Sequence, residues 1–110
     1  MFPYDDNNFP RWCLVTLPER PRMVIDKKHN RAEVDLVVEK AALSSDGLEY
    51  KVFFRTESLA RWYRRKHDLR TYLVLGLNYE NWLGMTDGEQ IMVIEGIADD
   101  EVVAYLMSPE

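Results

Sequence analysis

The chain has 110 residues, of which 46% are hydrophobic and 30% charged, and its net charge at pH 7 is −5. This length suits one hydrophobic core rather than two, and the composition is that of a folded protein rather than a disordered one. The acidic excess argues against broad non-specific binding to nucleic acid, because a phosphate backbone attracts Lys and Arg. The apolar runs are all too short to span a bilayer, so we expect no membrane partner.

The cysteine and histidine content limits the chemistry further. Cys13 is the only cysteine, and His29 and His67 are the only histidines. A single thiol excludes an internal disulfide and any Cys-based zinc site, so a bound metal would have to be held by carboxylates. The first eight residues have neither the basic nor the apolar part of a secretory signal, and we expect a cytoplasmic protein.

The N-terminal third predicts an arm followed by short strands. Residues 1–10 contain two prolines and three aromatics, and we expect them to form an N-terminal arm on a single domain that spans 11–110. Residues 12–17 predict a strand that ends at Pro18. Residues 22–26 predict a second strand, which a four-residue loop, 27–30, connects to the next as a hairpin.

Alternation is regular from residue 31 to residue 40. Val34, Leu36 and Val38 fall on one side of an extended chain, and Glu33, Asp35 and Glu39 fall on the other. This pattern predicts a strand with one buried face. Turn residues at 44–47 lead into the next strand, so the two strands predict a hairpin in which Glu49 lies opposite about residue 42 and Asp35 opposite about residue 56.

A β-α-β unit over residues 48–77 is the centre of the expected fold. It consists of a strand at 48–56, a helix at 58–69 that buries Leu59, Trp62 and Tyr63, and a strand at 70–77. After it we expect a tight loop at 78–81, a short strand or bend at 82–85, a turn at 86–89 and a strand at 90–94. The acidic residues at 99–101 suit a helix start, but we favour a strand at 102–107 that pairs back on 90–97.

These elements together predict an α+β domain. We expect a mixed sheet of five to seven strands, with the 48–77 unit in it and the helix at 58–69 as the one main helix packed on one face.

Asp35, followed by Glu49 and Lys51, has the order of a known catalytic pattern. It resembles the PD-(D/E)xK motif of restriction-endonuclease-like nucleases. That resemblance implies that Asp35 and Glu49 bind Mg²⁺ and that Lys51 lies near the scissile phosphate. The same residues also fit the wet faces of two amphipathic strands, and the register above separates Asp35 from Glu49 by about 7 residues of strand, too far to share an ion.

A second resemblance covers a longer piece of the chain. Residues 50–62, 71–75 and 82–83 are similar to a defence-associated family of bacterial domains of unknown function, which has a strand, a Leu-x-x-Trp helix, an apolar strand and a closing aromatic in this order. In that alignment the family's Gln/Glu-x-Lys falls at Val38-Glu39-Lys40, which lacks the first ligand. The two resemblances imply the same architecture but place a catalytic site differently.

A basic helix is the remaining candidate feature. Residues 55–70 carry a local charge of +4, and the cations that we consider as binding residues are Arg55, Arg61, Arg64, Arg65 and Arg70. Together with Trp62 they suit a phosphate backbone or an acidic protein surface, but such a stripe is more often an ordinary solvated helix face.

We therefore expect a non-catalytic interaction module, an accessory or phage-type protein that binds another macromolecule, a protein in our first interpretation, through the basic helix and exposed aromatics, with no cofactor. The alternative is a Mg²⁺-dependent nuclease, or its inactive descendant, that uses Asp35, Glu49 and Lys51. Sequence patterns leave the oligomeric state open.

Overall fold

The computed structural model describes residues 4–20, 22–29, 31–42, 47–98 and 101–107, with β3 and β9 described by their backbone alone. Within these residues the elements are, in chain order, β1 (Trp12–Thr16), β2 (Met23–Asp26), β3 (Arg31–Val34), β4 (Val37–Val38), β5 (Lys40–Ala42), β6 (Glu49–Phe54), α1 (Glu57–Lys66), β7 (Leu73–Gly76), α2 (Tyr79–Thr86), β8 (Ile91–Ala98) and β9 (Glu101–Met107). The expected α+β class is confirmed, with a seven-stranded mixed sheet and a separate pair, β2 and β3.

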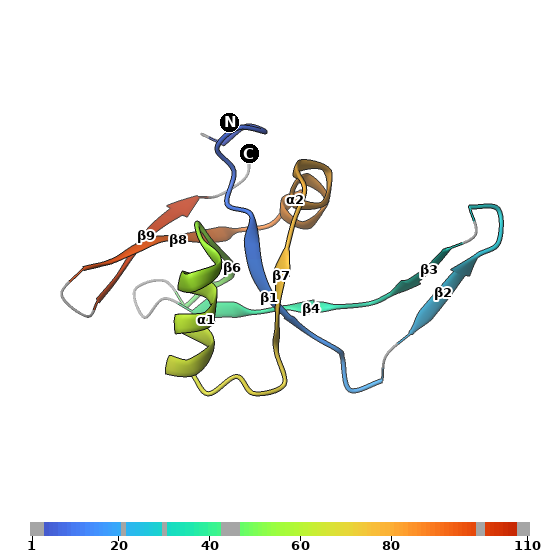
Figure 1. Ribbon diagram of the computed structural model, residues 1–110, viewed down its shortest axis with the longest axis horizontal. Helices are drawn as coiled ribbons and strands as arrows, with labels where there is room; N and C mark the ends of the chain where they lie inside the picture. The colour runs from blue at the N-terminus through green and yellow to red at the C-terminus, as the bar shows by residue number, and fades with distance from the viewer. Residues whose placement is uncertain (1–3, 21, 30, 43–46, 99–100, 108–110) are drawn as a thin grey trace.

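The main sheet is organised around β1 and β6. Strand β1 is antiparallel to both β6 and β7, so β6 and β7 run parallel with β1 between them. The predicted β-α-β unit is therefore present as β6-α1-β7, with β1 inserted between its two strands (Figure 1). The parallel neighbour of β6 is β8, and β9 pairs antiparallel to β8, which confirms the strand expected at 102–107.

Strands β1 and β6 pair over only two residue pairs and then diverge, which leaves an opening between them that we call the fork. They pair at Trp12–Phe54 and Cys13–Phe53, and the segment β4–β5 then runs across the opening. Its β4 end pairs with β1 and its β5 end pairs with β6. At the junction, the Glu39 amide donates to the Leu14 carbonyl and the Glu39 carbonyl accepts from the Val52 amide. Where the sequence predicted a single strand at 31–40, the structure therefore has three, β3, β4 and β5, and each of them pairs with a different strand.

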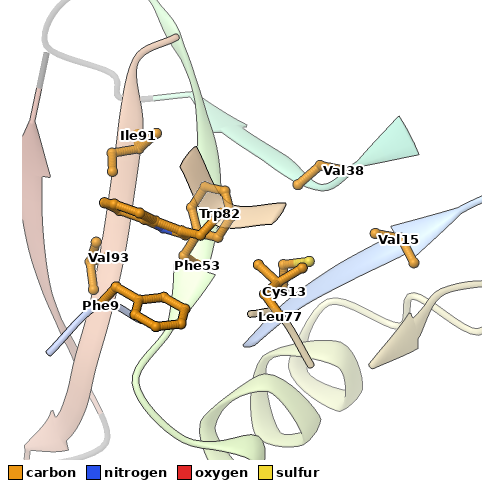
Figure 2. Close-up of a cluster of buried hydrophobic side chains, with 9 residues drawn as sticks. All are labelled: Phe9, Cys13, Val15, Val38, Phe53, Leu77, Trp82, Ile91 and Val93. Atoms are coloured by element: carbon orange, nitrogen blue, oxygen red, sulfur yellow. The ribbon is translucent and has the colours of Figure 1, made fainter. Parts of the chain in front are cut away.

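Alternation along the strands divides the core between the two faces of the sheet. Residues at every second position of β1, β6 and β8 pack beneath α1, and those between them pack against α2 and the N-terminal segment. Figure 2 shows the second cluster, in which Trp82 of α2 lies against Ile91 and Phe53 with Phe9 beside them. Phe9 is only 2% exposed, so residues 4–10 complete the core on this face.

Helix α1 forms where the sequence predicts it but ends earlier. The Thr56 hydroxyl caps the start by accepting from the Leu59 amide, and Leu59 and Tyr63 are buried beneath the helix, with Trp62 half-buried beside them. The helix was expected to continue to Leu69. It ends at Lys66 because the chain turns at Asp68, whose φ of 53° lies in the left-handed region.

Helix α2 was not predicted, and the expected loop at 78–81 and strand or bend at 82–85 are wrong. Asn78 begins the helix, since its side chain accepts from the Asn81 amide. Helical geometry turns Trp82 into the core at 0% exposure. The turn predicted after it is present: Gly88 has a φ of 70°, and the Glu89 amide donates to the Thr86 carbonyl.

Candidate functional site

The structure does not bring Asp35 and Glu49 together. Asp35 lies between β3 and β4, where its amide donates to the Arg22 carbonyl, so the expectation that it faces residue 56 is wrong. Glu49 pairs with Ala42, as expected. Residues 35 and 42 are the two ends of the segment that crosses the fork, and seven extended residues span roughly 23 Å. These two carboxylates do not suit one shared Mg²⁺.

Lys51 is engaged inside the fold. Its ammonium is largely buried and donates to the Met85 carbonyl at 2.9 Å, with Glu89 at 3.5 Å. Lys51 therefore joins β6 to the C-terminal turn of α2. Across the described ranges, no group of three or more His, Cys, Asp and Glu side chains is arranged to hold a metal ion.

The Glu39-Lys40 pair, which the second resemblance aligns with the family's catalytic motif, lies where β4 passes into β5. The half-buried Glu39 is placed by its backbone bonds to β1 and β6, and the exposed Lys40 pairs across the sheet with Lys51.

Four of the five candidate arginines have internal contacts. Arg61 pairs with Glu57 one turn earlier in the helix, and Arg70 pairs with Asp68. Arg64 donates to the carbonyls of residues 69 and 70, which follow the helix. Arg65 is exposed at the last turn. Together with Asp68, the arginines at 64, 65 and 70 line a shallow hollow of about 310 Å³.

Arg55 has a structural role. Its guanidinium bonds to both carboxylate oxygens of Glu95 and to the Asn8 carbonyl, and it lies over the ring of Tyr4. The hydrogen bond from Arg55 lowers the pKa of Glu95 below its ordinary value, and the same bond raises the pKa of Arg55. This network attaches the N-terminal segment to the main sheet.

Aromatic side chains are less available than the sequence suggested. Every aromatic ring whose burial the structure describes is buried or half-buried. Trp62 of α1 packs at the edge of the core, with the Lys66 ammonium 4.8 Å from the centre of its ring. The helix therefore presents cations rather than exposed rings.

Strands β2 and β3 form a two-stranded ribbon that stands away from the main sheet (Figure 1). We call this element the β-ribbon; it comprises β2, β3 and the described loop residues 27–29. The molecule measures 49 × 33 × 27 Å, and its radius of gyration is 14.7 Å, against about 13 Å for a compact domain of this length. The β-ribbon lies at one end of the long axis and the β8–β9 hairpin at the other (Figure 1).

The β-ribbon exposes apolar side chains. Met23 and Ile25, two residues apart on one face of β2, are 64% and 65% exposed. A two-stranded ribbon is marginally stable by itself in water, because one hairpin buries too little apolar surface. The hairpin was predicted at this position, but its separation from the core was not.

An apolar groove begins at the base of the β-ribbon and extends to α2 on the sheet face opposite α1. It consists of two hollows of about 450 and 610 Å³ that share Leu36 as a wall. Leu17 and Leu73 line the first, and Leu75, Leu77 and Glu80 line the second. Leu73 is 67% exposed and Leu36 is 47% exposed. The sequence pattern expected Leu36 to be buried, so this residue marks apolar surface that the single chain leaves uncovered.

No family model matches this chain, and neither the curated proteins nor the solved structures contain a match to it. A search of the described residues finds no helix with the length and apolarity needed to cross a membrane.

Proposed function

We propose that the protein is a non-catalytic interaction module that binds another protein through the β-ribbon and the adjoining groove. The observation that carries this proposal is the exposure of Met23 and Ile25 on an element that projects from the domain. Scattered exposed hydrophobic residues are ordinary, but a contiguous apolar surface is typical of a protein interface. Leu17, Leu36 and Leu73 extend the apolar surface across the base of the β-ribbon.

The contact surface proposed here differs from the one that the sequence suggested. The basic helix was the expected contact, yet four of its candidate cations serve intramolecular contacts. A protein partner also agrees with the net charge of −5, which opposes binding to a polyanion.

The experiment is site-specific photo-crosslinking in the cells that encode the protein. A photoreactive residue at position 25 should form adducts with a protein, whereas the same residue at Ile97, which is 44% exposed on β8, should not. Mass spectrometry of the adducts identifies the partner. Equal yields of adduct at positions 25 and 97 would contradict the proposal.

The hollow at the end of α1 supports a second candidate function, the binding of a phosphate-containing polymer. Arg65 and Arg70 are exposed there, and three arginines face one 310 Å³ hollow. Arginine forks match phosphate oxygens geometrically. Asp68 and the negative end of the helix dipole reduce the attraction, and this function therefore ranks second.

A further inference from the structure

We propose that the protein partner is a second copy of this chain, in a two-fold dimer in which each β-ribbon lies in the groove of the other copy. This inference rests on the proposed function and names its partner. Its first support is that one chain carries both halves of the contact: an apolar strand face, Met23 and Ile25, and an apolar groove with Leu36 and Leu73 on its walls.

The relative directions of the two halves provide the second support. In Figure 1 the β-ribbon extends sideways beyond β4, whereas β7, which lines the groove through Leu73 and Leu75, runs up toward α2, so the ribbon and the groove-lining strand point in different directions. Within one chain the β-ribbon therefore stands away from the groove, as a pair separate from the main sheet. A two-fold axis near the base would place the ribbon of each copy along the groove of the other, with the same residues contributed by each copy.

The lengths of ribbon and groove also agree. Strand β2 (Met23–Asp26) in the β-ribbon and strand β7 (Leu73–Gly76) in the groove each extend over three residue steps, or roughly 10 Å. The tip of a ribbon that starts at the base of the other copy would then reach the start of α2.

Charge is complementary at that far end. Lys27 is exposed at the ribbon tip, and Glu80 is exposed in the first turn of α2 on the groove wall, where the nearby Lys51 ammonium is already engaged by Met85 and Glu89. The apolar residues would pack near the base while Lys27 approaches the Glu80 carboxylate, which favours this direction of insertion over its reverse.

The size of the contact favours a reciprocal arrangement. A stable interface involves about 20–30 residues on each side. One face of a ribbon would bring about six residues of one chain against about fifteen of the other, since side chains alternate along each strand. Because each copy would donate a ribbon and also receive one, each side of the two-fold dimer contributes both sets of residues and reaches the lower end of the range of a stable interface.

The test measures the mass of the purified full-length chain in solution. Sedimentation equilibrium should give twice the 13.0 kDa of one chain, with dissociation on dilution. Ile25→Glu on the β-ribbon and Leu73→Glu in the groove should each raise the dissociation constant at least about tenfold, because each places a charge where the dimer would bury an aliphatic side chain. Ile97→Glu makes the same change at an exposed site outside both surfaces and should leave the dimer intact.

Mixing the two variants tests reciprocity. The Ile25→Glu chain keeps an intact groove and the Leu73→Glu chain keeps an intact ribbon, so the mixture should form a heterodimer through one good contact, more tightly than either variant alone. Circular dichroism confirms that each variant is folded.

A wild-type chain that stays monomeric up to its solubility limit would overturn the dimer, as would a dimer that both variants leave unchanged. A monomer whose position 25 still crosslinks to a different protein in cells would overturn this inference but support the proposed function. A monomer without such adducts would contradict both.

Discussion

Arg55 and Glu95 form a two-point ion pair that joins the end of β6 to the middle of its parallel neighbour, β8. The Nε of Arg55 lies 2.9 Å from Oε2 of Glu95, and its Nη2 lies 2.8 Å from Oε1. The Tyr4 hydroxyl donates to the same carboxylate, so one acidic side chain connects β6, β8 and the N-terminal segment. Both charged groups are about one quarter exposed, which limits screening by water.

The Arg55–Glu95 pair predicts a specific dependence of stability on pH. The pKa of Glu95 is lowered in the folded state, chiefly by its hydrogen bond to Arg55. The pair therefore stabilises the fold fully above the ordinary carboxyl pKa of 4.5 and loses its contribution as the pH falls through the lower folded value. Glu95→Gln should reduce the free energy of unfolding by about 1–2 kcal/mol at pH 7. Urea denaturation at a series of pH values measures this.

The difference in unfolding free energy between wild type and Glu95→Gln should shrink as the pH is lowered below 4.5. Glu49→Gln serves as the control, because Glu49 is exposed on β6 and should show little effect. A difference that stays constant from pH 7 to pH 3 would contradict a charge-assisted bond at Glu95.

Burial makes the Cys13 thiol unreactive. Cys13 is 0% exposed in β1, and burial raises its pKa to about 12. A thiol reagent at pH 8 should therefore modify the native protein only when the chain unfolds, because the thiolate is the reactive form. The labelling rate should rise with urea in parallel with unfolding measured by circular dichroism. Rapid labelling without urea would show that β1 opens locally.

The burial of Phe9 predicts that the N-terminal segment stabilises the fold. Its ring is 2% exposed and packs against Tyr79 and Trp82, with ring centres 5.4 and 5.8 Å away. Phe9→Ala should lower the free energy of unfolding by about 3 kcal/mol, the usual cost of such a core truncation. Asp6→Ala, at an exposed position in the same segment, should change it little. Equal effects of the two substitutions would mean that the segment does not stabilise the core.

Substitution of Lys51 tests whether this residue has a structural or a catalytic role. Since its ammonium donates to the Met85 carbonyl, Lys51→Ala should destabilise the protein by about 1–2 kcal/mol. Plasmid DNA incubated with the wild-type protein and Mg²⁺ or Mn²⁺ should remain intact. If the wild-type protein cleaves the DNA in the presence of the metal and a folded Lys51→Ala variant does not, the nuclease alternative with Asp35, Glu49 and Lys51 would be supported instead.

Arg65 tests the second candidate surface. If the hollow at the end of α1 binds phosphates, binding of single- or double-stranded nucleic acid should weaken with added salt, and Arg65→Glu should weaken it several-fold further. Arg65 suits this test better than Arg64, whose guanidinium also bonds to carbonyls beyond the helix. Lys40→Glu makes the same charge change on β5 and is the control. Equal effects of both substitutions would indicate net charge rather than a defined surface.

The sequence predicted local structure well where one pattern dominated. The spacing of Leu59 and Tyr63 located α1, and the turn residues of the sequence at 44–47, most of which lie outside the described residues, predicted the register that pairs Ala42 with Glu49. Helix α2 was missed because it has only eight residues and includes Gly84. The Asn78 cap was the available signal, since its side chain accepts from an amide three residues later.

The candidate surface was predictable only in part. Alternation at Leu36 and Val38 predicts apolar residues on one face, but only the fold shows that Val38 reaches the core while Leu36 remains 47% exposed. That outcome depends on where β1 and β6 separate, and local sequence patterns do not report a contact between distant strands. For the same reason the sequence predicted one strand at 31–40, where the structure has the second strand of the β-ribbon followed by the segment β4–β5 that crosses between β1 and β6.

Strand β1 cannot pair with both of its neighbouring strands until late in the synthesis of the chain. Cys13 leaves the ribosome early, but it pairs with Phe53 on one side and with Leu75 on the other. Strand β6 in turn waits for β8, its parallel neighbour. Contacts between such distant segments form slowly, because a long loop must close before any of them is gained. The nascent chain therefore exposes Leu14 and Val15 until most of its length has emerged, and this strand is where we expect chaperones to bind first.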